Sequence, residues 1–180
     1  WGLFNVAQHH PGHTYHTGLS TYSLLVAGYE SGQLTREAFR TAIVRLLAWQ
    51  HILLPIDATL IYEELVERGF EVDASIRLMV CNATDPSYSP EAAIKTVMEV
   101  VRKVALSSVG KGALATITSI AVEQLMVERH PILIAQLFLR EAQQTLHLLP
   151  REYAIVKERT EAVLIAKIAE QRHPLMFIHK

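Results

Sequence analysis

The sequence predicts an all-α protein of seven to eight helices, packed as one compact helical bundle or as two helical subdomains. Three observations lead to this prediction. Half of the 180 residues are hydrophobic, which supplies enough apolar surface for a sizeable core. Apolar side chains recur at the three- and four-residue spacing of a helix. Residues that typically begin or end helices separate the apolar segments.

The first half of the chain contains four expected helices, each bounded by a recognisable residue. Gly32 supplies the left-handed residue that commonly ends a helix. Thr35, Asp57 and Asp73 are expected to be the N-caps of the next three helices. The four helices are expected over about residues 19–31, 36–50, 58–68 and 74–82.

The helix expected over about residues 90–109 has the clearest pattern in the chain. Ser89 and Pro90 supply an N-cap followed by proline at the first helical position. Its charged residues lie on the face opposite the apolar stripe, with opposite charges four residues apart. The stripe consists of Ile94, Val97, Met98, Val101 and Ala105. Three more helices are expected over about residues 113–129, 131–149 and 151–172.

Residues 132–139 are apolar except for Gln136. A helix that is apolar on all sides is generally buried. This segment is therefore predicted to be the central, buried helix of the second half, and Leu137→Asp is expected to unfold that half because it would bury an unpaired charge.

The loop at residues 84–90 contains two prolines and three serine or threonine residues, a composition typical of loops. It is the expected boundary between a segment at 1–84 and a second segment at 90–180, which is either a four-helix bundle or a region of helix-pair repeats. The sequence Arg-His-Pro-Ile-Leu at 129–133 recurs as Arg-His-Pro-Leu-Met at 172–176. The interval of 43 residues lies in the range of HEAT and armadillo repeats, but with two copies chance similarity is the preferred interpretation.

Four of the nine histidines, His9, His10, His13 and His16, lie within eight residues. Imidazole is a common zinc ligand, so this segment is a candidate metal site. Its spacing matches no known zinc motif, and a polar loop is the preferred interpretation.

An acidic stretch surrounds the third expected helix. Clustered carboxylates are ligands for magnesium, but a solvated helix face is the preferred interpretation here, with Glu64 paired to Arg68 four residues later. Glu64→Ala is therefore expected to cost little stability. The acidic residues are Asp57, Glu63, Glu64, Glu67, Glu71 and Asp73.

No residue set points to a catalytic mechanism. The segment Gly110-Lys111-Gly112 lacks the spacing of a phosphate-binding loop. Cys81 has no accompanying nucleophile signature and is expected to be packed. The catalytic residues are therefore unknown, and no cofactor is expected from the chain alone.

Charge and cysteine content give expectations about partners and compartment. The net charge is −1 and neither half is strongly basic, so nucleic acid is not the default partner. The single cysteine is consistent with a reducing compartment, and the apolar runs are shorter than the roughly 20 residues that cross a bilayer. A cytoplasmic protein without membrane contact is expected.

Because the chain begins at Trp1 with an apolar segment, it is also expected to be a fragment of a longer protein.

Residues 14–68 resemble the C-terminal end of PIN-domain ribonucleases of the toxin and conflict-system type. The resemblance rests on Thr17-Gly18, on Leu24-Leu25 and on Gly32-Gln33-Leu34, which give a small turn, an apolar helix and a glycine exit. PIN nucleases bind magnesium or manganese through acidic residues, most of which precede this helix. Residues 1–17 contain no Asp or Glu, so no catalytic residue is transferred to this chain. The resemblance implies a metal-dependent ribonuclease, and a nucleic-acid partner, only if upstream acidic residues complete the domain.

Three functions follow from these observations. The first is a non-catalytic helical C-terminal segment of a PIN-like bacterial protein, acting in packing and partner binding. The second is a free-standing helical module for protein interaction or oligomerisation. The third is a small metal-dependent enzyme that uses the histidines between His9 and His16 to bind zinc.

Overall fold

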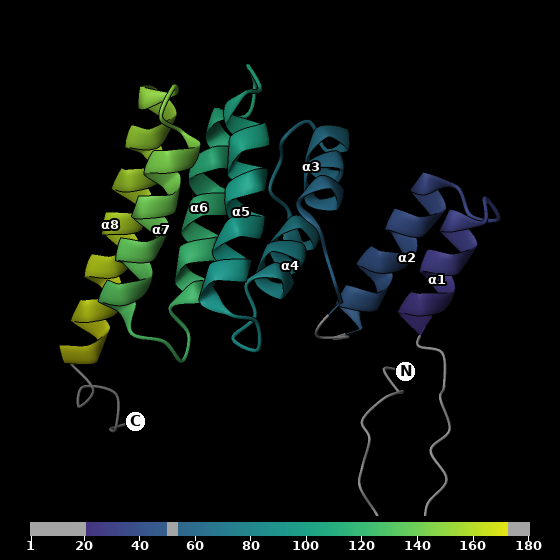
Figure 1. Cartoon of the computed structure of the whole chain (residues 1–180), viewed down its shortest axis with the longest axis horizontal. Coiled ribbons are helices and arrows are strands. Elements are labelled where there is room, and N and C mark those ends of the chain that lie inside the picture. Colours follow the sequence, from purple (N-terminus) through teal and green to yellow (C-terminus); the bar gives the residue numbers. More distant parts are fainter. Residues whose placement is uncertain (1–20, 50–53, 173–180) are drawn as a thin grey trace, which may run out of the picture. The chain divides into compact units, whose positions relative to one another are not determined.

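The computed structural model describes residues 21–49 and 54–172. These ranges contain eight helices and no strand, which confirms the all-α prediction (Figure 1). The helices are α1 (Thr21–Glu30), α2 (Arg36–Ala48), α3 (Ala58–Glu67), α4 (Ala74–Ala83), α5 (Pro90–Ala105), α6 (Lys111–Leu125), α7 (Pro131–Thr145) and α8 (Pro150–Arg172).

The helix ends lie close to the predicted positions because local side chains satisfy the first backbone N–H groups of a helix. The Thr35 hydroxyl accepts a hydrogen bond from the Ala38 backbone N–H at 3.1 Å. The Asp57 carboxylate accepts one from the Leu60 backbone N–H at 2.7 Å. Gly32, which follows α1, has a φ of 73°. This is the left-handed conformation that the sequence predicted for it.

The chain divides into two compact units, Trp1–Leu54 and Pro55–Lys180. The loop at residues 84–89, where the sequence analysis placed a boundary, lies inside the second unit. There α3 packs against α5, and α4 packs against α6, across that loop. A loop-like composition therefore marks a turn between packed helices in this chain.

In the first unit, α1 and α2 form a hairpin. The rings of Tyr29 and Phe39 stack with their centroids 5.1 Å apart, and the Arg36 guanidinium lies 5.2 Å from the Tyr29 ring centroid. The turn is held by the Leu34 backbone N–H, which donates to the Gly28 carbonyl at 2.9 Å.

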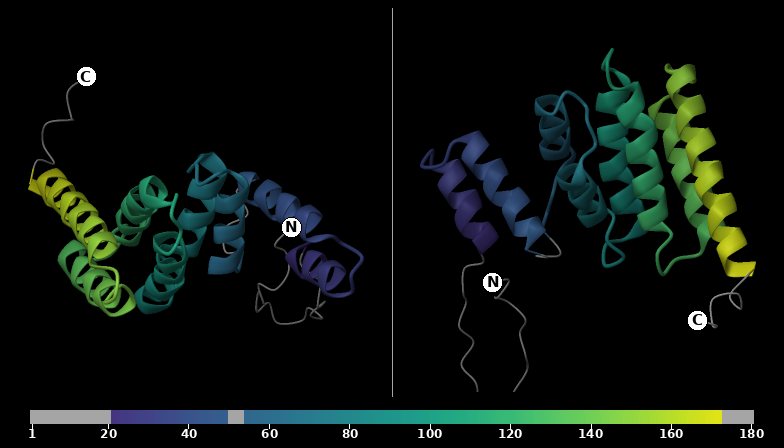
Figure 2. Two further views of the ribbon diagram at one scale, coloured as in Figure 1. Left: turned by 90° about the horizontal axis from the view of Figure 1, so that it is seen from above. Right: turned by 180° about the vertical axis from the view of Figure 1, so that it is seen from behind.

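The described part of the second unit, up to residue 172, consists of three helical hairpins, α3–α4, α5–α6 and α7–α8. The odd-numbered helices α3, α5 and α7 pack against one another in one layer, and the even-numbered helices α4, α6 and α8 form the other. Figures 1 and 2 show the hairpins following one another across the unit. This is the arrangement of an α-solenoid, in which each repeat packs mainly on its neighbours.

The middle hairpin contributes the largest share of the core. Helix α5 buries seven side chains and α6 buries eight, because other helices cover each of them on more than one side. Val101, Val104 and Leu125 are fully buried.

The prediction that residues 132–139 form a helix buried on all sides is wrong. Ile132 is 46% exposed and Leu133 is 53% exposed, while Leu137 is half-buried. Helix α7 belongs to the last hairpin, so α5 packs on one side of it, and no other odd-numbered helix within residues 54–172 covers the opposite side.

Thr118 lies in α6 with no exposed surface, and its hydroxyl has no hydrogen-bond partner within the part of the chain that the structure describes. A buried unpaired hydroxyl costs about 1–3 kcal/mol. We expect Thr118→Val, which keeps the shape and removes the hydroxyl, to raise stability by about 1 kcal/mol and the melting temperature by about 2–4 °C. Thermal unfolding followed by circular dichroism measures this.

Thr160 is the matched control for this substitution. It is equally buried, but its hydroxyl donates to the Val156 carbonyl at 2.8 Å. Thr160→Val therefore removes a satisfied group and is expected to leave stability unchanged or slightly lower. An equal gain from both substitutions would show that the gain does not come from the unpaired hydroxyl.

Candidate functional site

The candidate zinc ligands His9, His10, His13 and His16 lie outside the described residues, so zinc binding there stays a prediction. Within residues 21–49 and 54–172, no three or more His, Cys, Asp or Glu side chains are grouped as a metal site would require. This includes the carboxylates around α3.

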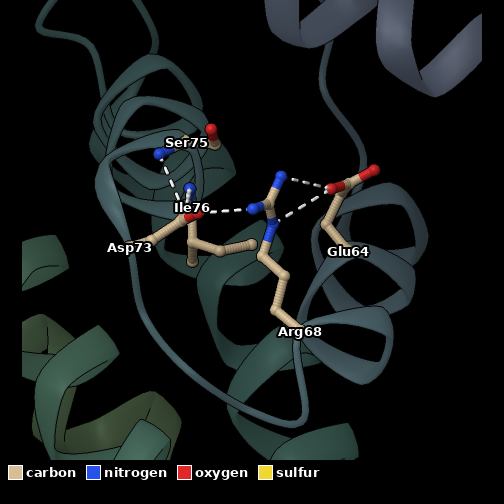
Figure 3. A network of polar contacts seen from close by, with 5 residues as sticks. All are labelled: Glu64, Arg68, Asp73, Ser75 and Ile76. Carbon is tan, nitrogen blue, oxygen red and sulfur yellow. Dashed lines mark hydrogen bonds and ion pairs between the residues drawn. The ribbon is translucent and has the colours of Figure 1, made fainter.

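Part of the acidic stretch around α3 forms a polar network (Figure 3), whereas Asp57, Glu67 and Glu71 are exposed, as predicted. Arg68 donates from Nε and Nη2 to the Glu64 carboxylate at 3.3 and 3.2 Å, as the i,i+4 spacing predicted. Arg68 also donates from Nη1 to Asp73. Glu64 is only 5% exposed, so the prediction that it lies on a solvated face is wrong.

This network links the end of α3 to the start of α4. The second oxygen of Asp73 accepts hydrogen bonds from the backbone N–H groups of Ser75 at 2.9 Å and Ile76 at 3.0 Å. Asp73 thus caps α4 while it binds Arg68. Both carboxylates serve the packing of the α3–α4 hairpin, and we assign them no catalytic role.

A second link joins α3 to α5 at Lys103. Its ammonium donates to the Thr59 hydroxyl at 2.9 Å and lies 5.8 Å from the Tyr62 ring centroid. Glu99 lies 3.7 Å from the same nitrogen. The contacts with Thr59 and Tyr62 hold α3 and α5 together, whereas the contact with Glu99 lies within α5.

Arg129 fixes the turn between α4 and α5, a role that the sequence analysis missed. Its Nη2 donates to the backbone carbonyl of Asp85 at 3.1 Å and to that of Tyr88 at 2.7 Å. The only sequence signal was the Arg-His-Pro motif in which Arg129 stands.

Cys81 is half-buried on α4. Burial raises the pKa of its thiol, the positive charge of Arg77 opposes this, and the negative charge of Glu123 adds to it. A raised pKa keeps the thiol protonated at neutral pH and makes it a poor nucleophile. The cysteine is therefore a packing residue, as expected.

The outer side of α8 carries a strip of exposed apolar side chains. Only Val156 and Thr160 are buried among its described side chains. Ile165 is 68% exposed, and the alanines around it are also exposed. We call this surface the α8 outer face; it consists of Ala162, Ile165, Ala166 and Ala169.

A groove of about 610 Å³ lies between the start of α7 and the end of α8. Pro131 and Ile132 line it from α7, and Ile168 and Gln171 line it from α8. The rest of its lining comes from the segment between α6 and α7, at Met126, Glu128, Arg129 and His130. Its size is in the range of binding pockets, about 300–1,000 Å³. A smaller cavity of about 240 Å³ beside α4 and α5 has mainly apolar walls.

Comparison with known proteins finds no matching family model, no matching curated protein and no matching solved structure. None of the described helices has the length and apolar character needed to cross a membrane.

Proposed function

We propose that the second unit is an oligomerisation module in which α8 pairs antiparallel with α8 of a second copy. The observation that carries the proposal is the α8 outer face. Exposed apolar patches with polar surroundings are typical of interaction sites. Ile165 stands at the centre of this face, and alanines before and after it allow another helix to approach closely.

Charge complementarity favours a second copy as the partner. Arg159 and Glu170 are both exposed and lie eleven positions apart, about three helical turns, so they share one flank of the α8 outer face. If two α8 helices pair antiparallel with their centre between Leu164 and Ile165, Arg159 of each copy lies opposite Glu170 of the other. Such opposed charges set orientation and register.

Composition agrees with this proposal. Charged residues make up 19% of the chain, below the usual share of about a quarter.

The PIN resemblance spans α1, α2 and α3, which belong to two different units. The proposal therefore rests on the last hairpin and not on that resemblance. The PIN-like origin and the cytoplasmic location stay predictions.

Ile165→Glu is expected to abolish self-association, because it places two carboxylates at the centre of the pair. Sedimentation equilibrium of the full chain should give twice 20.2 kDa for the parent protein and 20.2 kDa for the variant. Far-UV circular dichroism should not change, because Ile165 faces solvent. Leu148→Glu is the matched control, since Leu148 is 79% exposed but lies in the turn before α8; it should still associate.

Charge reversal tests the register. Arg159→Glu alone, or Glu170→Arg alone, places like charges opposite each other and is expected to raise the dissociation constant about tenfold, equivalent to about 1.4 kcal/mol. The double variant should restore the parent affinity. A parent chain that stays monomeric at all concentrations would refute self-association, and an apolar helix of another protein would become the candidate partner.

A further inference from the structure

Two turns of the second unit expose large apolar side chains. In the turn between α5 and α6, Leu106 is 63% exposed and Val109 is 69% exposed. The turn between α7 and α8 contains Leu148, which has the highest exposed fraction of any large apolar side chain in residues 21–49 and 54–172. Each turn joins the two helices of one hairpin, and Figures 1 and 2 show both turns at the same edge of the unit.

The turn between α3 and α4 does not share this character. Both figures show it set back from the other two turns, and it carries the exposed acidic residues Glu67 and Glu71. The apolar surface is therefore confined to the turns of the middle and last hairpins. We call it the tip surface; it consists of Leu106, Val109 and Leu148.

Exposed cations surround the tip surface. Arg102 and Lys111 flank the α5–α6 turn, and Arg151 follows the α7–α8 turn; all three side chains are exposed. No ion pair neutralises any of them within the described part of the chain. Residues 102–111 and 142–151 contain no Asp or Glu, and Glu152, which follows, is only partly exposed. The tip surface is thus an apolar surface with positively charged surroundings.

The opposite edge of the unit has a different character. The turns between successive hairpins lie there, and they carry the acidic residues Asp85 and Glu128. Within residues 84–89 and 126–130, Val127 is the only exposed large apolar side chain, at 37%. The Arg129 guanidinium is bound to backbone carbonyls of the same edge. Apolar side chains and exposed cations therefore occur together at one edge only.

We propose that the tip surface binds the anionic surface of a lipid bilayer. Apolar side chains enter the boundary between headgroups and acyl chains, while nearby Lys and Arg residues attract anionic lipids. The three apolar side chains stand on turns and line none of the cavities described above, so they suit a deformable surface better than a preformed groove. The sequence analysis expected no membrane contact because no apolar run crosses a bilayer, but binding at the surface needs no such run.

This binding does not use the α8 outer face. Ile165 lies fourteen positions after Arg151, which is about 20 Å along the helix. Antiparallel pairing of α8 would place the tip surfaces of the two copies at opposite ends of the dimer. Each tip surface would then bind lipid as it does in a single copy.

Flotation of the full chain with lipid vesicles tests the proposal. We expect binding to vesicles of mixed phosphatidylcholine and phosphatidylserine, and binding weaker by about tenfold or more to phosphatidylcholine alone. Leu106→Glu and Leu148→Glu should each weaken binding to the mixed vesicles about tenfold, because each removes an inserted apolar side chain and adds a charge that anionic lipids repel. Val127→Glu, at the opposite edge, is the matched control and should bind like the parent. Far-UV circular dichroism should be unchanged in all three variants.

Neutral substitutions of the cations measure the electrostatic part. Lys111→Gln and Arg151→Gln should each weaken binding to the mixed vesicles about fivefold, the contribution of one basic residue near an anionic membrane. Lys95→Gln is the matched control, because Lys95 is exposed in the second turn of α5, away from the tip surface. It should bind like the parent chain.

Three results would overturn the proposal. If the parent chain does not bind the mixed vesicles, an acidic protein becomes the candidate partner of the tip surface. Equal binding to both lipid compositions would show that the cations take no part. Binding that Leu106→Glu and Leu148→Glu leave unchanged would place the lipid contact on another surface. Ile165→Glu should bind vesicles like the parent, whether or not the parent self-associates, so failure of the α8 pairing and failure of lipid binding are distinguishable.

Discussion

Phe138→Ala is expected to lower the free energy of unfolding by about 3–5 kcal/mol. Phe138 has no exposed surface and lies in α7, which packs against both α5 and α8. Removal of its ring leaves a cavity where the last hairpin meets the middle one. Urea unfolding followed by circular dichroism, with a linear extrapolation to zero denaturant, measures the loss.

Leu137→Ala is the matched control, one residue earlier on the same helix. Leu137 is only half-buried, so we expect a loss of about 1 kcal/mol. We likewise no longer expect Leu137→Asp to unfold the second half, because its carboxylate can reach water. Equal losses from Phe138→Ala and Leu137→Ala would contradict the orientation of α7 described above.

Arg68→Met should destabilise the second unit by about 2–3 kcal/mol. The substitution keeps an unbranched apolar side chain but removes the cation that binds Glu64 and Asp73. Breaking a fully buried pair costs about 3–5 kcal/mol, and the loss is smaller here because the Arg68 side chain is 33% exposed. Denaturant unfolding of the full chain measures it.

Arg77→Met controls for the loss of a positive charge. Arg77 is exposed on α4, so its replacement should change stability by no more than about 0.5 kcal/mol. Similar losses for both arginines would indicate a general charge effect instead of a specific network. Because Glu64 is buried, Glu64→Ala should now cost more than the sequence analysis expected.

The ends of the helices could be predicted because they depend on neighbouring residues. Thr35, Asp57, Asp73 and Ser89 each accept a backbone hydrogen bond at the start of a helix, and the residues alone identify them as caps. Pro90 at the first helical position adds to the same local signal.

The burial of individual helix faces could not be predicted in the same way. The apolar run in α7 predicts burial on all sides, but burial depends on how many helices surround the element. Glu64 shows the opposite error. Its charge predicts an exposed side chain, but the carboxylate is buried because it is paired with the Arg68 guanidinium. The exposure of α7 depends on contacts between hairpins, which the local sequence does not encode.

The candidate site was the least predictable part. The three hairpins share an arrangement but little sequence, so one five-residue motif was the only visible sign of a repeat. Arg129 within that motif binds carbonyls more than forty residues away in the chain. The α8 outer face was also missed, because the sequence of a helix gives no indication of which side lacks a neighbour.

The stacking of hairpins has a consequence for local opening. Because contacts run mainly between successive hairpins, the free energy of the second unit is close to a sum of nearest-neighbour terms. The last hairpin can then detach while the middle hairpin keeps its packing on α3 and α4. Sub-global opening from the α7–α8 end would thus precede global unfolding. It would expose the surface of α5 and α6 to other chains without loss of the remaining fold.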